Sequence, residues 1–124
     1  MRCRGIRGAT SVEANEVDAI TAASRELLER IVSLNHPRPE DVASVIFTVT
    51  PDLDAVYPAR AAHEMGWGNT PLLCVQEMAV AKSLPRCIRV LVLWNTDLRP
   101  DQIRHVYLGR ALALRPDLMK EVEK

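Results

Sequence analysis

The chain carries one long amphipathic helix pattern among several strand patterns, and this imbalance limits the folds it can adopt. From Val17 to Leu34, apolar or small residues recur every three or four positions, which predicts a helix with one buried face. The β-branched run at 43–49 and the apolar run at 87–94 predict strands. Because one long helix can cover only one face of a sheet, we expect an α+β fold whose second sheet face is open.

The other segments complete a mixed β-sheet. Asn15 followed by Asp18 resembles a capping box that starts the long helix, and the sequence at 35–37, Asn-His-Pro, ends it. We expect a short helix at 58–65, packed on the same face as the long one. Further strands are expected at 2–9, 72–77, 105–108 and 110–114. At 124 residues, 1–124 makes a single domain, with 115–124 as a flexible C-terminal tail.

Charge and residue usage exclude several classes of protein. The 16 basic and 16 acidic side chains cancel, which argues against binding nucleic acid through bulk electrostatics. The longest unbroken apolar run, 90–94, is far shorter than a membrane-spanning helix, and the charged N-terminus is not followed by a signal-peptide core. Three widely spaced cysteines and three scattered histidines suggest neither a disulfide framework nor a metal site. We therefore expect a cytoplasmic protein whose open sheet face binds further copies of the chain.

Two charged residues interrupt the strand patterns. Arg89 lies within the most hydrophobic strand, on the same face as Leu91 and Leu93 by period-two counting. A charge at such a position must be paired or belong to a site, unless the strand end is frayed and the side chain reaches water. Glu77 ends the strand at 72–77, where it either contributes to a site or marks the exit of the strand into solvent.

Two further side chains add recognition chemistry without an obvious nucleophile or base. Arg7 lies between two glycines in the first strand, where glycine permits close approach of another chain or a ligand. Alternatively, Arg7 is a charge on an edge strand that discourages aggregation. Tyr107 is either a site phenol or a core aromatic. No orienting partner lies next to His63 or His105 in the sequence, and Cys74 lacks visible activation. These residues predict a pocket that recognises carboxylates and polar oxygens and stabilises charge.

Six segments together resemble one enzyme family. They are RGIRGAT at 4–10, TPDLDAVYPARAA at 50–62, CVQEM at 74–78, CIRV at 87–90, DQIRHVYL at 101–108 and LRPDL at 114–118. Their order and spacing resemble the monofunctional bacterial chorismate mutases of the trimeric pseudo-α/β-barrel type. The resemblance implies a homotrimer whose sheets pack into a barrel-like core, with active sites between subunits. It also implies rearrangement of chorismate to prephenate, for phenylalanine and tyrosine biosynthesis, without cofactor or metal.

The resemblance assigns roles to individual residues. It implies that Arg89 is the main electrostatic catalyst at the ether oxygen of the substrate, and that Glu77 accepts a hydrogen bond from the substrate hydroxyl. The implied substrate-binding positions are Arg7 and Tyr107 for a carboxylate, Leu73, Cys74, Val75 and Gln76 near the hydroxyl, Tyr57 as an aromatic wall, Arg60, and the closing segment Leu114 and Arg115.

The chain departs from the family pattern at the rim of the expected pocket. His63 stands where the family has a second basic residue, and the loop at 66–70 is one residue shorter. Two alternatives remain open, a trimeric imine deaminase-like enzyme that also uses an interfacial arginine, and a trimer that binds a metabolite without catalysis. The motifs RGIRGAT and CVQEM favour the mutase over the first, and consumption of chorismate separates it from the second.

Overall fold

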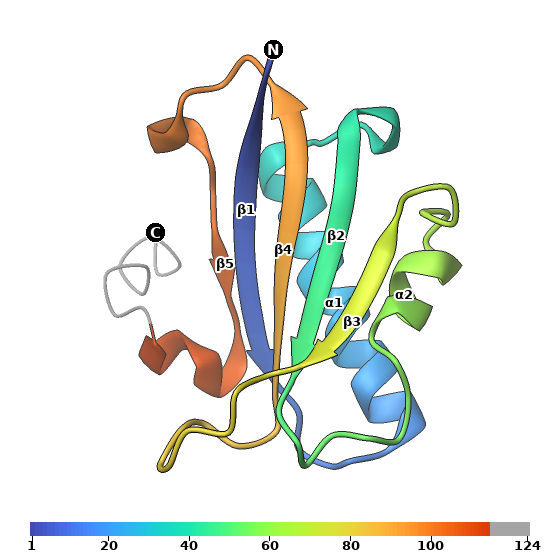
Figure 1. Cartoon of the computed structure of the whole chain (residues 1–124), viewed down its shortest axis with the longest axis vertical. Helices are drawn as coiled ribbons and strands as arrows, with labels where there is room; N and C mark the ends of the chain where they lie inside the picture. Colours follow the sequence, from blue (N-terminus) through green and yellow to red (C-terminus); the bar gives the residue numbers. More distant parts are fainter. Residues whose placement is uncertain (115–124) are drawn as a thin grey trace.

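A five-stranded mixed sheet forms the centre of the fold (Figure 1). The structure, a computed structural model, describes residues 1–114. In the strand order β3-β2-β4-β1-β5, β4 pairs antiparallel with β1 and β2, whereas the outer pairs β1–β5 and β2–β3 are parallel. The strands are β1 (Arg2–Ser11), β2 (Val42–Val49), β3 (Leu72–Gln76), β4 (Cys87–Thr96) and β5 (Val106–Tyr107). The expected α+β class is confirmed.

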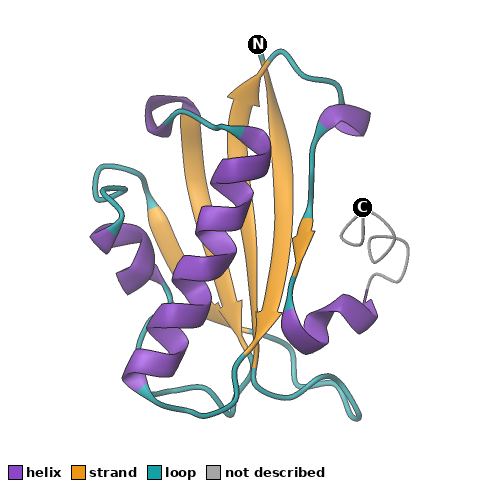
Figure 2. Ribbon diagram, turned by 180° about the vertical axis from the view of Figure 1, so that it is seen from behind, coloured by secondary structure: helices purple, strands orange, loops and turns teal. Residues whose placement is uncertain are grey.

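Two helices cover the same face of this sheet (Figure 2). The long helix α1 (Val17–Asn35) crosses the strands and contacts the short helix α2 (Ala59–Glu64). Gly8 allows α1 to pack closely, because an added Cβ would lie 3.0 Å from the Leu27 side chain and 3.1 Å from Ile31. The close approach that glycine permits is used here by the chain's own helix. Three 3₁₀ turns complete the described chain, η1 (Pro39–Asp41), η2 (Pro100–Gln102) and η3 (Gly109–Leu114).

The other face of the sheet has no α-helix over it within residues 1–114 (Figure 1), and the 3₁₀ helix η3 packs only on its Ala9 end. Along β4 the even-numbered residues 88–94 are buried against α1, whereas Arg89, Leu91 and Leu93 are only half-buried. The strand registers place residues from three further strands on this same side. We call it the open face and define it by Gly5, Arg7, Ala9, Ile46, Thr48, Leu73, Val75, Arg89, Leu91 and Leu93.

The predicted capping box is wrong. Helix α1 begins after Glu16, and no side chain caps its first amide groups. Asn15 instead bonds to a different loop, where its Oδ1 accepts hydrogen bonds from the backbone amides of Asp54 and Ala55. Competition from these exposed amides, far away in the sequence, explains why the local pattern misled. The ends of the predicted helix face also differ, since Val17 and Leu34 are exposed.

The strand predicted at 110–114 is also wrong. Gly109 has a φ of +57°, and the amide of Ala111 donates to the carbonyl of Leu108, so the chain turns into η3. Ser11 Oγ accepts the Arg110 amide at 3.0 Å, which fixes the turn to the end of β1. The short apolar alternation at 110–114 therefore forms a 3₁₀ turn rather than a strand. The predicted tail at 115–124 lies outside the described residues.

A polar bracket holds the start of β4. Asp52 accepts the Arg86 amide at 2.9 and 3.1 Å and the Thr50 hydroxyl, while Thr50 Oγ1 accepts the buried amide of Cys87 at 3.0 Å. Burial alone would raise the pKa of Asp52, but the hydrogen bonds from Thr50 and Arg86 outweigh it and hold this pKa below its usual value. The bracket fixes β4 two residues before Arg89.

We expect Asp52→Asn to lower the free energy of unfolding at pH 7 by about 0.5–1 kcal/mol, since the carboxylate is largely exposed. A lowered pKa means that the carboxylate stabilises the fold at neutral pH, and that this contribution is lost as the pH falls through the lowered value. Urea unfolding across this range should show the wild-type and variant stabilities converging in acid. A difference that stayed constant with pH would show that the charge contributes nothing.

Candidate active site

An arginine–glutamate pair lies on the open face near the start of β4. Arg89 Nε is 2.7 Å from Glu77 Oε1, and the two side chains are 39% and 22% exposed. The amide of Glu77 donates to the carbonyl of Val49, which continues the β2–β3 pairing one residue beyond β3. This extension carries the carboxylate across β2 toward Arg89. Both residues that interrupted the strand patterns are thus brought together.

The pair is held from one side and remains accessible from the other. Thr48 Oγ1 donates to Glu77 Oε1 at 3.3 Å, so the carboxylate is fixed by β2 as well as by Arg89. Arg89 Nε is buried, yet its N–H is not aligned for a hydrogen bond with any residue of the described chain. Because a guanidinium has five N–H donors, contact with one carboxylate oxygen leaves donors for a ligand. The arrangement suits recognition of an oxygen that carries or develops negative charge.

Tyr107 and Arg7 lie on the same side of the sheet. Ala9 pairs with Arg89 on one side and with Tyr107 on the other, which places the three residues in one row across the sheet. Tyr107 is 6% exposed and packs with Ala9 and Cys87, and Leu114 packs against the same cluster. Arg7, two residues from Ala9 along β1, is exposed on the open face.

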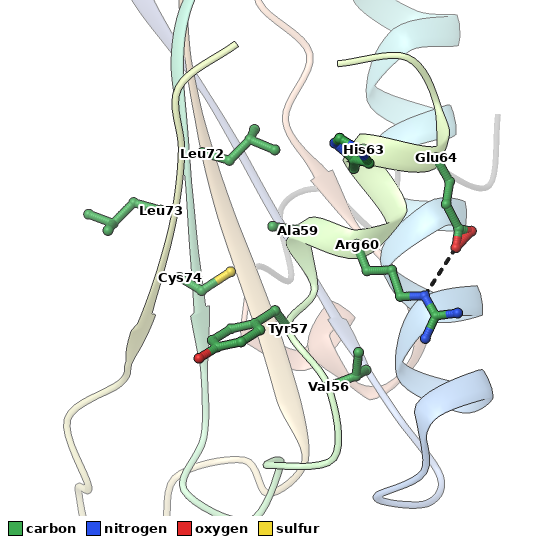
Figure 3. A pocket seen from close by; sticks show the side chains of 9 residues that line it. All are labelled: Val56, Tyr57, Ala59, Arg60, His63, Glu64, Leu72, Leu73 and Cys74. Atoms are coloured by element: carbon green, nitrogen blue, oxygen red, sulfur yellow. Dashed lines mark ion pairs between the residues drawn. The ribbon is translucent and has the colours of Figure 1, made fainter. Parts of the chain in front are cut away.

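A second group of predicted site residues lines a groove between α2 and β3 (Figure 3). The groove has a volume of about 800 Å³. Figure 3 shows Cys74 pointing toward Tyr57 and α2, whereas Leu73 points away from the helix. Arg60 forms an ion pair with Glu64, with 3.3 Å between Arg60 Nε and Glu64 Oε1. Tyr57 is 74% exposed, which makes its ring an open wall of the groove.

Within one chain, the two groups do not form a single pocket. The edge strand β3 separates the groove on the helix side from Arg89 and Glu77 on the open face. Val75 belongs to the open face, Gln76 is exposed at the end of β3, and Arg115 lies outside the described residues. A site that used both groups would require a second copy of the chain.

Comparison with known proteins identifies the family. The model of the family described as chorismate mutase type I matches residues 3–118. The chain belongs to this family. It is 50% identical over 119 residues to chorismate mutase AroH of Bacillus subtilis (strain 168), covering 95% of this chain and 94% of the relative. It is 53% identical over 116 residues to chorismate mutase AroH of Thermus thermophilus, covering 93% and 95%.

A solved structure agrees with this membership. The chorismate mutase from Clostridium thermocellum superposes with a TM-score of 0.87 at 46% sequence identity. The match covers 89% of this chain and 98% of the solved chain. The resemblance inferred from the six sequence motifs is therefore confirmed for the family and for the fold.

Neither Cys74 nor Cys87 of this chorismate mutase family member provides an activated thiolate. Burial raises the pKa of the Cys74 thiol, partly opposed by a hydrogen bond from the Ala59 backbone, and burial likewise raises the pKa of Cys87 despite the nearby Arg89 charge. All three cysteines are free. Among residues 1–114, no cluster of three His, Cys, Asp or Glu side chains is arranged to hold a metal ion. None of the described helices is long and apolar enough to cross a membrane.

Sequence reasoning missed two residues next to the expected site. Thr48 contacts Glu77, and period-two counting along 43–49 could have placed it beside Ile46 on the open face. His105 bonds to the backbone of Arg7, a contact between segments 98 positions apart. No local pattern signals such a contact, so His105 was passed over as an isolated histidine.

Proposed function

We propose that this chain is a chorismate mutase that rearranges chorismate to prephenate in the biosynthesis of phenylalanine and tyrosine. In this reaction the ether C–O bond breaks while a new C–C bond forms within the same molecule. No atom or proton leaves, and negative charge grows on the ether oxygen. The reaction therefore needs a compact substrate conformation and a cation at that oxygen.

The observation that carries this proposal is the Arg89–Glu77 pair on the open face. The guanidinium of Arg89 stabilises the developing charge on the ether oxygen, an interaction that strengthens as the bond breaks. Glu77 keeps the guanidinium in place and accepts a hydrogen bond from the substrate hydroxyl. Thr48 orients the carboxylate for both tasks.

The other predicted residues bind the substrate in its reactive conformation. Arg7 and Tyr107 hold one carboxylate from the open face. Across the site, the groove presents the Tyr57 ring as an apolar wall and Arg60 as a further cation for this dianion. The segments Leu73–Gln76 and Leu114–Arg115 line and close the site. Holding a flexible molecule this way converts binding energy into a lower barrier.

The active form is a homotrimer in which the open face of one subunit meets the groove of its neighbour. The separation of the two groups within one chain supports this arrangement, since neither alone surrounds a substrate. The apolar side chains of the open face support it further, because a sheet face of this kind needs a covering layer. A cytoplasmic location is part of the proposal, supported by three free cysteines.

The direct experiment is to add chorismate to the purified protein and follow loss of its absorbance together with formation of prephenate. The proposal predicts catalytic turnover without added cofactor or metal. A protein that binds chorismate without converting it would be the metabolite-binding alternative. A protein that hydrolyses imines and leaves chorismate unchanged would be the deaminase-like one.

A further inference from the structure

We infer that His105 is a positioning residue for this reaction and that it acts through Arg7. The inference rests on the proposed function, because Arg7 matters only if it holds a carboxylate of the substrate. Its basis is the hydrogen bond from the backbone amide of Arg7 to His105 Nδ1, at 3.0 Å. An accepting Nδ1 places the proton of the neutral ring on Nε2.

The histidine ring replaces a missing backbone acceptor. Ala9 pairs with Tyr107, and the amide of Leu108 donates to the carbonyl of Ala9, so β1 and β5 follow a regular parallel pattern there. Two residues earlier, the same pattern would send the amide of Arg7 to the carbonyl of Arg104.

That carbonyl is already used by another residue. Asn35, buried at the end of α1, donates through Nδ2 to the carbonyl of Arg104 at 2.8 Å and accepts the Arg104 amide at 2.9 Å. The segment before β5 is thus turned toward the helix, and the regular pairing stops at Val106. His105 restores the lost bond with its side chain. It ties the backbone amide of Arg7 to the segment that leads into β5.

This link sets the spacing between two residues that bind substrate. Arg7 lies on β1 and Tyr107 lies two residues beyond His105, so the bond joins the strands that carry the two proposed carboxylate ligands. Without it, β1 and β5 remain paired only at Gly8 and Ala9. The Arg7 side chain would then sample more conformations in the free protein. The conformational entropy lost when the substrate orders it would weaken substrate binding.

The test compares two substitutions of the same residue. In His105→Asn, Oδ1 lies close to the position of Nδ1 and can accept the same bond. In His105→Phe, the ring remains but the acceptor is lost. We expect the Phe variant to lower kcat/KM about three- to tenfold, mainly by raising KM, and the Asn variant to stay within about twofold of wild type.

A double-mutant cycle with Arg7→Ala shows whether the effect passes through Arg7. If it does, His105→Phe should lower kcat/KM by less than about twofold in the Arg7→Ala background. A purely structural role would give the same loss in both backgrounds, and that result would overturn the inference. Equal losses for the Asn and Phe variants would also overturn it.

Amide exchange of the full-length protein measures the bond without reference to activity. The Arg7 amide should exchange at least about tenfold faster in His105→Phe than in wild type, and slowly again in His105→Asn. Unchanged exchange would overturn the inference while leaving the proposed function intact. A wild type that leaves chorismate unconverted would instead overturn the proposed function, and with it this role for His105.

Discussion

Replacing Arg89 with alanine is expected to lower kcat at least about a thousandfold, while KM changes only a few-fold. Arg89 is the cation nearest the proposed position of the ether oxygen, and charge appears on that oxygen only in the transition state. Losing the guanidinium therefore destabilises the transition state much more than it destabilises the bound substrate. Steady-state kinetics on chorismate separate the two constants.

Arg89→Lys should recover only part of this loss. Lysine restores a positive charge, but its single ammonium group cannot match the planar guanidinium, which lies against Glu77 and is proposed to contact the substrate as well. Arg38→Ala is a matched control, because Arg38 forms an exposed ion pair with Glu40 at 2.6 Å on the surface. The control should leave kcat unchanged. A near-normal kcat in Arg89→Ala would remove this residue from the chemistry.

Leu93→Asp is expected to dissociate the proposed trimer and to lower kcat/KM by at least about a hundredfold at low protein concentration. Leu93 lies on the open face opposite Gly5, away from the Arg89–Glu77 pair. A carboxylate there would have to be buried without a partner if another subunit covered the face, and this disfavours assembly. Light scattering gives the mass of the particle, and kinetics on the same sample give the activity.

An exposed leucine elsewhere provides the control for this change. Leu34 is 42% exposed on α1, and Leu34→Asp should leave both the mass and the activity close to wild type. Circular dichroism should show that the Leu93 variant keeps its fold. A folded Leu93→Asp protein that is monomeric and fully active would contradict a site shared between subunits.

The fold was predictable wherever one segment carried a strong period. Burial produces both patterns, since it selects apolar residues at every third or fourth position along α1 and at every second position along β4. The errors arose where distant partners decide. Asn15 bonds to the loop at 54–55, and the segment 110–114 follows a turn that Ser11 stabilises. Sequence separation hides such contacts until the chain is folded.

The candidate site was predictable in part, for a physical reason. Arg89 and Glu77 stood out because charge within apolar strands is costly, and the structure pairs them. The groove residues Tyr57 and Arg60 were assigned through the family resemblance, because exposed residues of a short helix and its preceding loop carry no such signal. The sequence does not reveal that the groove and the open face lie on opposite sides of β3, since this depends on the direction in which each side chain points from the folded strand.

The central claim is that each active site combines the open face of one subunit with the groove of another. Arg89→Ala disables the open face, and Arg60→Glu disables the groove by placing a carboxylate beside a dianionic substrate. In trimers assembled from equal amounts of the two chains, an intact site needs its open face from the Arg60→Glu chain and its groove from the Arg89→Ala chain. Random assembly gives this combination at about one site in four.

Subunit mixing is therefore the most direct measurement. The two variants, each nearly inactive alone, are unfolded together, refolded as mixed trimers and assayed for chorismate consumption. The account predicts that the mixture recovers about a quarter of the wild-type activity. A mixture no more active than its two components would show that each chain builds its site alone, and would contradict the account.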